Sequence, residues 1–243
     1  MRADLSQLRA QMRAIDRHHR ADVATLPTGA RGLDLALGGG LALGGVSELI
    51  PDVFMDEPAS ITFALACAAR ALHQRAGDLV IVEDGAHARL WGHLYAPGLQ
   101  AMGIDPARVL MIAPDTAKAF HGCLEECART TGLAAVLGLA GPKAGFALGA
   151  ARRVQLATEQ GQSLVLLVQS LRTPHFAPAC ARLRIASAPS QGQAFVGTAL
   201  PAPGRPAWTA HLDRARSGAP PQTFGLEYDD ATHCLYQPAT LAD

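Results

Sequence analysis

The sequence predicts an α/β protein built as a three-layer sandwich, with a mainly parallel central sheet, antiparallel strands toward the C-terminus and an N-terminal helix. Between residues 46 and 168, short and continuously apolar runs alternate with longer helix-like stretches. Strands that are apolar on both faces belong to a parallel sheet that helices cover on both sides. Beyond residue 168 the apolar runs are separated by clusters of glycine and proline, a spacing typical of antiparallel strands.

The composition fits one large globular domain, or a core with small appendages. Of the 243 residues, 49% are hydrophobic and 17% are charged, which gives ample apolar surface for a core and too little charge for a disordered chain. Charged and turn residues interrupt every apolar run before it reaches membrane-spanning length, and no secretory signal is recognisable. The five cysteines form no CxxC pair. We therefore expect a cytoplasmic protein without a membrane span.

The first segment, residues 1–25, is expected to hold an amphipathic helix and a linker. Leu5, Leu8, Met12 and Ile15 recur at steps of three and four residues, with arginine and glutamine between them. A helix set apart in this way docks either on its own domain or on a neighbouring subunit. The four apolar side chains are therefore candidates for partner binding.

Residues 26–213 are expected to form the core. Its first strands are predicted at 46–50, 79–82, 109–113, 134–139 and 164–168, and the helices between them at 59–75, 87–102, 117–131 and about 146–160. Later strands are predicted at 182–188, 195–199 and about 208–214, and a further strand at 223–228 falls in the last segment.

The last part, residues 214–243, is expected to be an edge strand and tail with exposed aromatic and charged side chains. An edge strand presents unpaired backbone donors and acceptors to another chain. Arg214, Arg216, Phe224 and Tyr228 are therefore further candidates for partner binding.

The most informative stretch is LPTGARGLDLALGGGLALGGVSELI at residues 26–50, which predicts a turn, a short helix, a glycine-rich bend and a strand. It resembles the opening of the RecA-type recombinase core, T-G-x-x-x-L-D-x-x-L-G-x-G-G-x-x-x-G-x-x-x-E-[IL], with one position deleted. The matching residues are Thr28, Gly29, Leu33, Asp34, Leu37, Gly38, Gly40, Gly44, Glu48 and Leu49. The glycines also have a structural use, because they allow positive φ values in tight turns.

In RecA-type proteins this strand leads into a phosphate-binding loop, G-x-x-x-x-G-K-[ST], whose N–H groups, lysine and hydroxyl hold phosphates and Mg²⁺. Here the segment 51–60 contains neither glycine nor lysine; its notable residues are Pro51, Asp52, Asp56, Glu57, Pro58, Ala59 and Ser60. The carboxylates repel phosphate, and each proline removes a backbone donor. The strand at 134–139 also ends without the carboxylate of a metal site. We expect no NTPase activity and no cofactor.

Glu83 and Asp84, at the end of the strand predicted at 79–82, have two interpretations. They fall near the position where the recombinase family carries its catalytic glutamate. Alternatively, they form a solvated strand end that caps the next helix.

Four features together resemble the ImuA family, a group of RecA-like proteins related to SulA. They are the lost phosphate loop, LYAPGLQAMGIDPARVLMIAPDT at 94–116, RLRIASAPS at 182–190 and RARSGAPPQTFGLEYDDATHCLY at 214–236. The resemblance implies a non-catalytic accessory protein of a DNA-damage-induced (SOS) complex for mutagenic translesion synthesis. It implies as partners ImuB, which is an inactive Y-family polymerase relative, RecA, and an error-prone replicative-type polymerase in the same assembly.

Two other functions stay open on the sequence alone. A SulA-like inhibitor of cell division shares the RecA-related ancestry. An ATP-dependent RecA-like recombination regulator would instead have to bind nucleotide.

The resemblance to RecA also implies a DNA-facing surface, since the loops after the fourth and fifth strands of RecA-type cores face single-stranded DNA. The corresponding loops are 140–146 and 169–180, and five arginines flank them: Arg152, Arg153, Arg172, Arg182 and Arg184. Because arginine-rich surfaces attract polyanions, these residues are candidates for contact with single-stranded DNA. The alternative is that they form solvated faces or protein contacts.

No pattern in the sequence predicts a metal site. Cys123 and Cys127 lie four residues apart on one expected helix, but no second Cys/His pair is near in sequence, so buried apolar cysteines are the simpler interpretation. The histidines considered, His18, His19, His87 and His93, show no acid at a defined spacing. We expect them to lie at the surface or to have satisfied hydrogen bonds.

Overall fold

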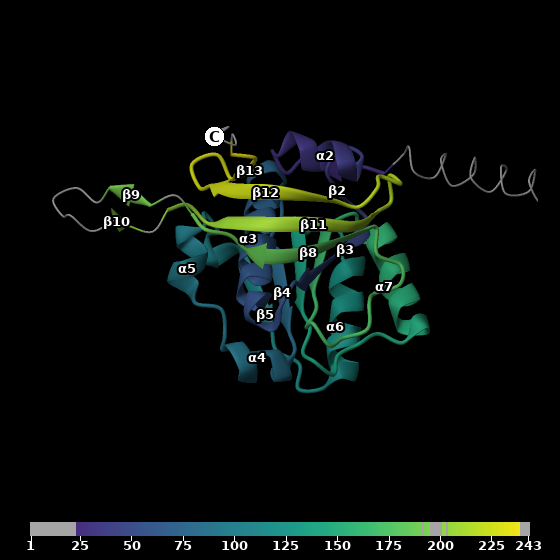
Figure 1. Cartoon of the computed structure of the whole chain (residues 1–243). Helices are drawn as coiled ribbons and strands as arrows, with labels where there is room; N and C mark the ends of the chain where they lie inside the picture. The colour runs from purple at the N-terminus through teal and green to yellow at the C-terminus, as the bar shows by residue number, and fades with distance from the viewer. Residues whose placement is uncertain (1–22, 191, 195–200, 203, 239–243) are drawn as a thin grey trace, which may run out of the picture.

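The computed structural model describes residues 23–190, 192–194, 201–202 and 204–238. Within these residues a nine-stranded mixed sheet runs through the molecule in the order β13-β12-β11-β8-β3-β7-β6-β4-β5 (Figure 1). Its parallel strands are β3 (Gly45–Pro51), β4 (Leu79–Glu83), β5 (Val109–Ile112), β6 (Ala135–Leu139), β7 (Leu164–Val168) and β8 (Ala181–Ser187). The predicted α/β fold with a parallel core is confirmed.

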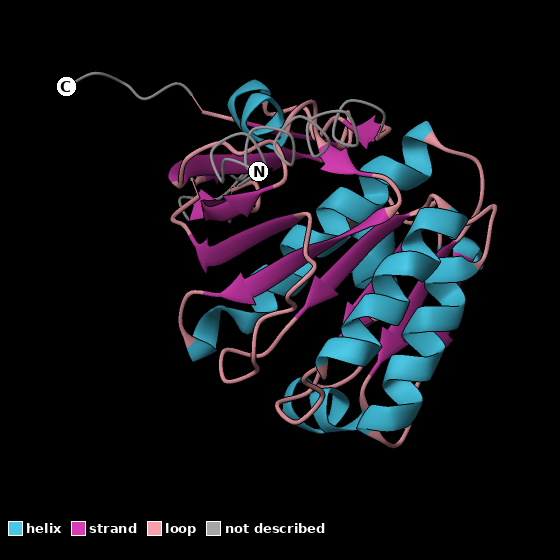
Figure 2. Cartoon of the chain, turned by 90° about the vertical axis from the view of Figure 1, so that its right-hand side faces the viewer, coloured by secondary structure: helices cyan, strands magenta, loops and turns pink. Residues whose placement is uncertain are grey.

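Helices cover both faces of the parallel strands (Figure 2). The long helix α3 (Glu57–Gln74) packs on one face, and α6 (Ala117–Arg129) lies beside α7 (Leu148–Gly161) on the other. Alternate residues of β4 enter the two layers, since Ile81 joins the core on the α3 side and Val82 joins the core on the α6 side. This burial on two faces is what the continuously apolar runs predict.

The segment at 26–50 folds as its pattern predicts. Helix α2 (Arg31–Leu37) is followed by the glycine bend and by β3, while β1 (Thr25–Leu26) pairs with β2 (Leu41–Ala42). The Asp34 carboxylate accepts hydrogen bonds from the backbone N–H and the hydroxyl of Thr28, both at 2.8 Å. Gly40 has a φ of 133°, and a Cβ atom at this position would collide with the Leu26 carbonyl. This turn therefore requires glycine.

The single helix expected at 87–102 is two short helices, α4 (Gly85–Trp91) and α5 (Ala96–Ala101). Gly92, with a φ of 78°, follows the end of α4, and Pro97 lies in the first turn of α5. Proline is tolerated in a first turn but breaks a helix interior. The apolar periodicity of this stretch therefore belongs to two helices.

The strand expected at 109–113 lies at the margin of the sheet and is not buried on both faces. Only β4 pairs with β5 among the described strands, and the side chains of Leu110 and Met111 are 57% and 40% exposed. Its apolar run resembled that of a central strand, so the sequence pattern gave no sign of the difference.

The C-terminal strands β11 (Ala207–Ala215), β12 (Gln222–Asp229) and β13 (Cys234–Tyr236) continue the sheet as antiparallel neighbours of β8. The boundary expected at residue 214 therefore falls inside β11. Phe224 and Tyr228 are buried in the core on the α3 side, so the expectation of exposed aromatics is wrong. On this side of the sheet the outermost described strand is β13, and β12 lies inside the sheet.

Two expected elements lie outside the described residues. They are the N-terminal helix with Leu5, Leu8, Met12 and Ile15, and the strand at 195–199. The latter falls between β9 (Gln193–Ala194) and β10 (Pro201–Ala202), which pair with each other.

Candidate functional site

The loop after β3 begins at the carboxyl edge of the parallel strands, where open α/β sheets place their binding sites. It passes through the 3₁₀ turn η1 (Phe54–Asp56) and leads directly into α3. The loop is tied to the neighbouring strand β8, because the Asp56 carboxylate accepts hydrogen bonds from the backbone N–H and the hydroxyl of Ser187 at 2.9 and 2.8 Å. Asp56 is therefore a buried structural residue.

The first turn of α3 contains a carboxylate, and its serine hydroxyl is already used in a hydrogen bond within the protein. Glu57 is the first residue of the helix and is completely buried, and Pro58 follows it. Ser60 is also buried, and its hydroxyl donates a hydrogen bond of 3.1 Å to the carbonyl of Asp56. Ala59 is half-buried against the core. Of the three carboxylates at 51–60, only that of Asp52 is exposed, and it lies 3.6 Å from an Arg184 nitrogen.

Beside Glu57 lies a cluster of buried ionisable groups. His87, on α4, places Nδ1 at 3.4 Å from Oε1 of Glu83 and Nε2 at 3.9 Å from Oε1 of Glu57. All three side chains are at most 1% exposed. The second oxygen of Glu83 lies 2.6 Å from Nδ1 of the exposed His93. We call Glu57, Glu83 and His87 the buried cluster.

The carboxyl pKa values of the buried cluster move in opposite directions. Burial raises the pKa of Glu57, although His87, Trp91 and Ser170 counteract that rise. Burial also acts to raise the pKa of Glu83, but the interactions with His87 and His93 outweigh it, so the pKa of Glu83 is lowered. The two buried carboxyl groups therefore bind protons with different affinities.

Two sequence expectations fail at this cluster. Glu83 and Asp84 are buried and do not form a solvated strand end, although Asp84 does cap α4 by accepting a hydrogen bond of 2.7 Å from the Ala86 N–H. His87 is buried, and neither of its ring nitrogens makes a hydrogen bond to the residues that the structure describes. The separation of four residues between Glu83, at the end of a strand, and His87, in the helix that follows, was the available signal. The contact with Glu57 depends on the tertiary fold.

The loop also exposes apolar side chains where a phosphate-binding loop would present N–H groups. Val53, Phe54 and Met55 are 52%, 49% and 73% exposed, and the Phe54 ring lies 5.0 Å from the Trp91 ring between centroids. We call these three residues the 53–55 surface. Such a surface suits contact with a protein better than contact with a polyphosphate.

Arg182 is not available to a nucleic acid. Its Nε atom donates a hydrogen bond of 2.5 Å to Oε2 of Glu48, which is buried on β3. Arg184 is held between Asp213, at 2.6 Å, and Asp52. These two candidates for DNA contact sit inside ion pairs because β8 lies beside β3 in the sheet, a neighbourhood that periodicity does not reveal.

The remaining arginine candidates lie near the predicted loops. Arg153, on α7, pairs with Glu125 of α6 at 3.0 Å, which fits the alternative of a helix-face contact. Arg152 and Arg172 are exposed. The loops at 140–146 and 169–180 do follow the fourth and fifth parallel strands, β6 and β7, at the carboxyl edge of the sheet.

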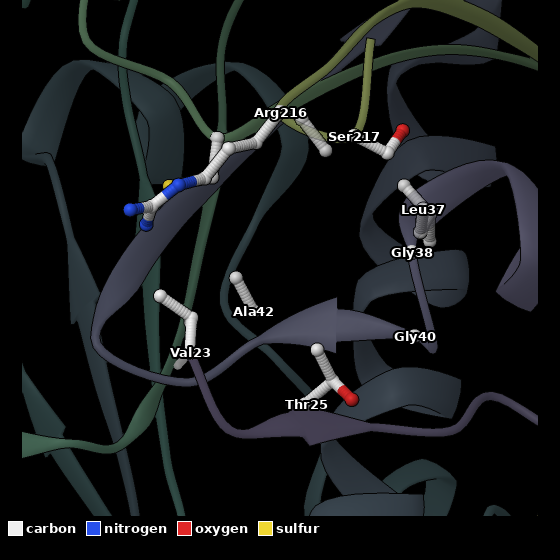
Figure 3. A pocket seen from close by; sticks show the side chains of 10 residues that line it. Val23, Thr25, Leu37, Gly38, Gly40, Ala42, Arg216 and Ser217 are labelled. Carbon is white, nitrogen blue, oxygen red and sulfur yellow. The ribbon is translucent and has the colours of Figure 1, made fainter. Parts of the chain in front are cut away.

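Arg214 and Arg216 lie at the opposite end of β8 from the 53–55 surface. Arg214 donates a hydrogen bond of 2.9 Å to the carbonyl of Ala177. Arg216 lines a small pocket of about 60 Å³ together with Val23, Thr25 and Cys180 (Figure 3). Burial raises the pKa of the Cys180 thiol, against the influence of Arg216. The pocket is separate from the buried cluster.

The described part of the chain holds no group of three or more His, Cys, Asp or Glu side chains arranged for a metal ion. Cys123 and Cys127 are half-buried on α6 against the neighbouring core, rather than fully buried as expected, and burial raises the pKa of Cys127 to about 11. In the same residues, no helix combines the length and the apolar character needed to cross a bilayer.

Comparison with known proteins gives a distant relationship to RecA. No family model matches the sequence. The chain is 34% identical to Protein RecA of Crocosphaera subtropica over 118 residues, which are 49% of this chain and 31% of that protein. It is also 34% identical to Protein RecA of Gloeothece citriformis over 111 residues, 46% of this chain and 28% of that protein. The matched segment thus spans about a third of each of these relatives.

The fold is similar to that of the RadB recombinase, as seen in its crystal structure. The TM-score is 0.60 at 16% sequence identity, and the match covers 88% of this chain and all of that one. This similarity concerns the fold alone. Together with the RecA matches, it supports the sequence-based relation to RecA-like proteins at the level of a distant relationship.

Proposed function

We propose that the protein is a non-catalytic accessory protein of a DNA-damage-induced complex for mutagenic translesion synthesis, acting through protein contacts. Its partners are an ImuB-like inactive Y-family polymerase and RecA, with an error-prone replicative-type polymerase in the same assembly. The distant relationship to RecA and the RadB-like fold support a RecA-like protein with a DNA-related role. The more specific role rests on the sequence resemblance to the ImuA family.

The main support for a non-catalytic role is that the first turn of α3 is already filled by the protein's own groups. A helix N-terminus favours a negative charge, and phosphate-binding loops use this property. Here the turn already contains the buried carboxylate of Glu57, and the Ser60 hydroxyl is bound to the backbone of Asp56. When Glu57 is ionised, a second anion in this place would meet a repulsion of about 4 kcal/mol per charge pair at 4 Å and an effective dielectric constant near 20.

The 53–55 surface is where we place contact with the ImuB-like partner. The surface lies at the carboxyl edge of the sheet, which is where α/β proteins place their binding sites. The side chains exposed there are apolar, so this edge suits a protein partner better than a nucleotide. Contacts between proteins draw on exposed apolar and aromatic side chains of this kind.

The test compares two exposed apolar positions. Met55→Asp should lower capture of the purified ImuB-like partner at least tenfold, because a charge would be buried at the contact. Leu35→Asp is the matched control, since Leu35 is 71% exposed on α2, away from the loop, and should leave capture unchanged. Equal capture by wild type and Met55→Asp, with both proteins folded, would refute the placement.

The alternative of a SulA-like division inhibitor makes a different prediction. Overexpression would then block division and give filamentous cells whether or not an ImuB-like partner is present. We expect no filamentation that is independent of that partner.

A further inference from the structure

Three ionisable side chains from three elements meet in the buried cluster, out of contact with solvent. Glu57 begins α3, Glu83 ends β4 and His87 lies on α4. Neither oxygen of Glu57 and neither ring nitrogen of His87 makes a hydrogen bond to any described residue. Buried polar atoms without partners are uncommon in folded proteins, and their electrostatic interactions are strong because little water screens them.

Two ionisable side chains in the described part of the chain, His93 and Asp84, adjoin the cluster. His93 contacts Glu83 from the connection between α4 and α5. Asp84 is directed into the first turn of α4 through its hydrogen bond with Ala86. Trp91, on α4, and Ser170, after β7, face Glu57 and are uncharged. With both carboxylates ionised, a proton on His87 would lie between two negative charges.

We propose that Glu57, His87 and Glu83 share one proton, and that loss of this proton as the pH rises separates the start of α3 from α4 and shifts the 53–55 surface. While the proton is present, an imidazolium or a neutral Glu57 carboxyl keeps the cluster at one net negative charge. Once it is lost, two carboxylates face each other across a neutral ring in a buried site that screens their charges poorly. The inference concerns the fold and holds whichever partner binds the surface.

The opposite pKa directions of the two carboxyl groups agree with a shared proton. Glu83 stays ionised between two histidines, whereas Glu57 binds its proton more tightly than an ordinary glutamate. Groups that interact this closely titrate as a unit, so the proton belongs to the cluster and not to one residue.

The aromatic pair carries the effect of the proton to the surface. Trp91 lies at the end of α4, the helix that holds His87, and its ring packs against Phe54 of the loop. A change in the distance between α3 and α4 therefore changes the position of Phe54. By linkage, whatever binds the 53–55 surface must also change the proton affinity of the cluster.

The chain has two tryptophans, which makes the test direct. Trp91 borders the cluster, while Trp208 is buried in β11 against Phe63. In the full chain labelled with 5-fluorotryptophan, ¹⁹F NMR should show the Trp91 resonance shifting in a one-proton step as the pH is raised. The Trp208 resonance should stay in place and report an intact fold.

The variants decide whether the proton belongs to the cluster. His87→Gln and Glu57→Gln should each abolish the step, and Glu57→Gln keeps the shape of the side chain if His87→Gln fails to fold. His93→Gln is the control, because it removes an exposed neighbour and should retain the step. A Trp91 resonance that does not move with pH, or a step that persists unchanged in both cluster variants, would overturn the proposal.

Discussion

Arg182 donates a hydrogen bond of 2.5 Å from Nε to Oε2 of Glu48 and so joins β8 to β3 within the sheet. The other Glu48 oxygen accepts hydrogen bonds from the Gln169 amide, at 2.8 Å, and from the Phe176 N–H, at 2.7 Å. Glu48 is one of the residues that match the RecA-type opening pattern. Its visible role here is to anchor the strand that leads into the candidate site.

Loss of one partner of this ion pair should destabilise the fold. Arg182→Ala leaves the Glu48 carboxylate buried without its cation, a change that costs about 3–5 kcal/mol. Urea unfolding should show this loss, whereas Arg172→Ala, at an exposed position, should change stability by less than about 0.5 kcal/mol. Equal stabilities of the two variants would show that the ion pair is not structural.

Substitution of Glu57 should change how stability depends on pH. Because the folded state raises the pKa of Glu57, the folded protein binds that proton more tightly than the unfolded chain, and stability falls as pH rises above the ordinary value near 4.5. Glu57→Gln should remove this fall and make the variant relatively more stable at pH 8 than at pH 5, by about 1.4 kcal/mol per unit of the pKa difference.

Glu83 should behave in the opposite sense. Its lowered pKa contributes stability that is present above the ordinary pKa and is lost as pH falls through the lowered value. Glu83→Gln should therefore destabilise the protein more at pH 7 than at pH 4 in urea unfolding. Equal losses at the two pH values would contradict the lowered pKa.

Two glycines should respond to alanine in opposite directions. Gly40→Ala places a Cβ against the Leu26 carbonyl at a φ of 133° and should cost about 3 kcal/mol. Gly149→Ala, in α7 with open space around the new Cβ, should stabilise the protein by about 0.5–1 kcal/mol. Thermal unfolding measures both, and a tolerated Gly40→Ala would mean that the turn has another conformation.

Contact with single-stranded DNA, if the loops after β6 and β7 make it, should depend on Arg152 and Arg172. Their double replacement by alanine should reduce the slope of log affinity against log salt by about 1.4, which is two phosphate contacts at about 0.7 each. Arg129→Ala, in an ion pair on α6, is the control and should leave the slope unchanged. If DNA binding by the wild-type protein does not depend on salt, the proposed contact between these arginines and single-stranded DNA is refuted.

Partner binding by residues 214–243 is better tested by a point substitution than by truncation. A cut at Arg214 would remove β12 and β13, with the buried Phe224, Tyr228 and Leu235, and would expose the core. Loss of capture by such a truncation would report unfolding. Arg214→Glu in the full chain is a cleaner change, and we expect partner capture to stay within twofold of wild type.

The sequence predicted the elements that local pattern determines. The apolar runs of β3, β4, β6 and β7, and the glycine bend after α2, were recognisable because each is encoded by consecutive residues. The break at Gly92 and Pro97 was also visible, but the apolar periodicity across it favoured one helix. The edge position of β5 could not be read, because its residues resemble those of a central strand.

The candidate site was predictable only in part. The absence of a phosphate-binding loop follows from the residues at 51–60 alone, as does the acidic character of that segment. The burial of Glu57, its proximity to His87 and the pairing of Arg182 with Glu48 depend on strand order, which places distant segments side by side. These contacts join residues far apart in the chain, for which a single sequence carries no local signal.

Titration of the purified chain with fluorescently labelled ATP and Mg²⁺ is the decisive experiment on the non-catalytic role, with a RecA protein as the positive control. We expect no saturable binding at millimolar nucleotide, because the first turn of α3 contains a buried carboxylate and no lysine. Saturable, Mg²⁺-dependent binding that is lost on changing Ser60 to alanine in an otherwise folded protein would contradict it.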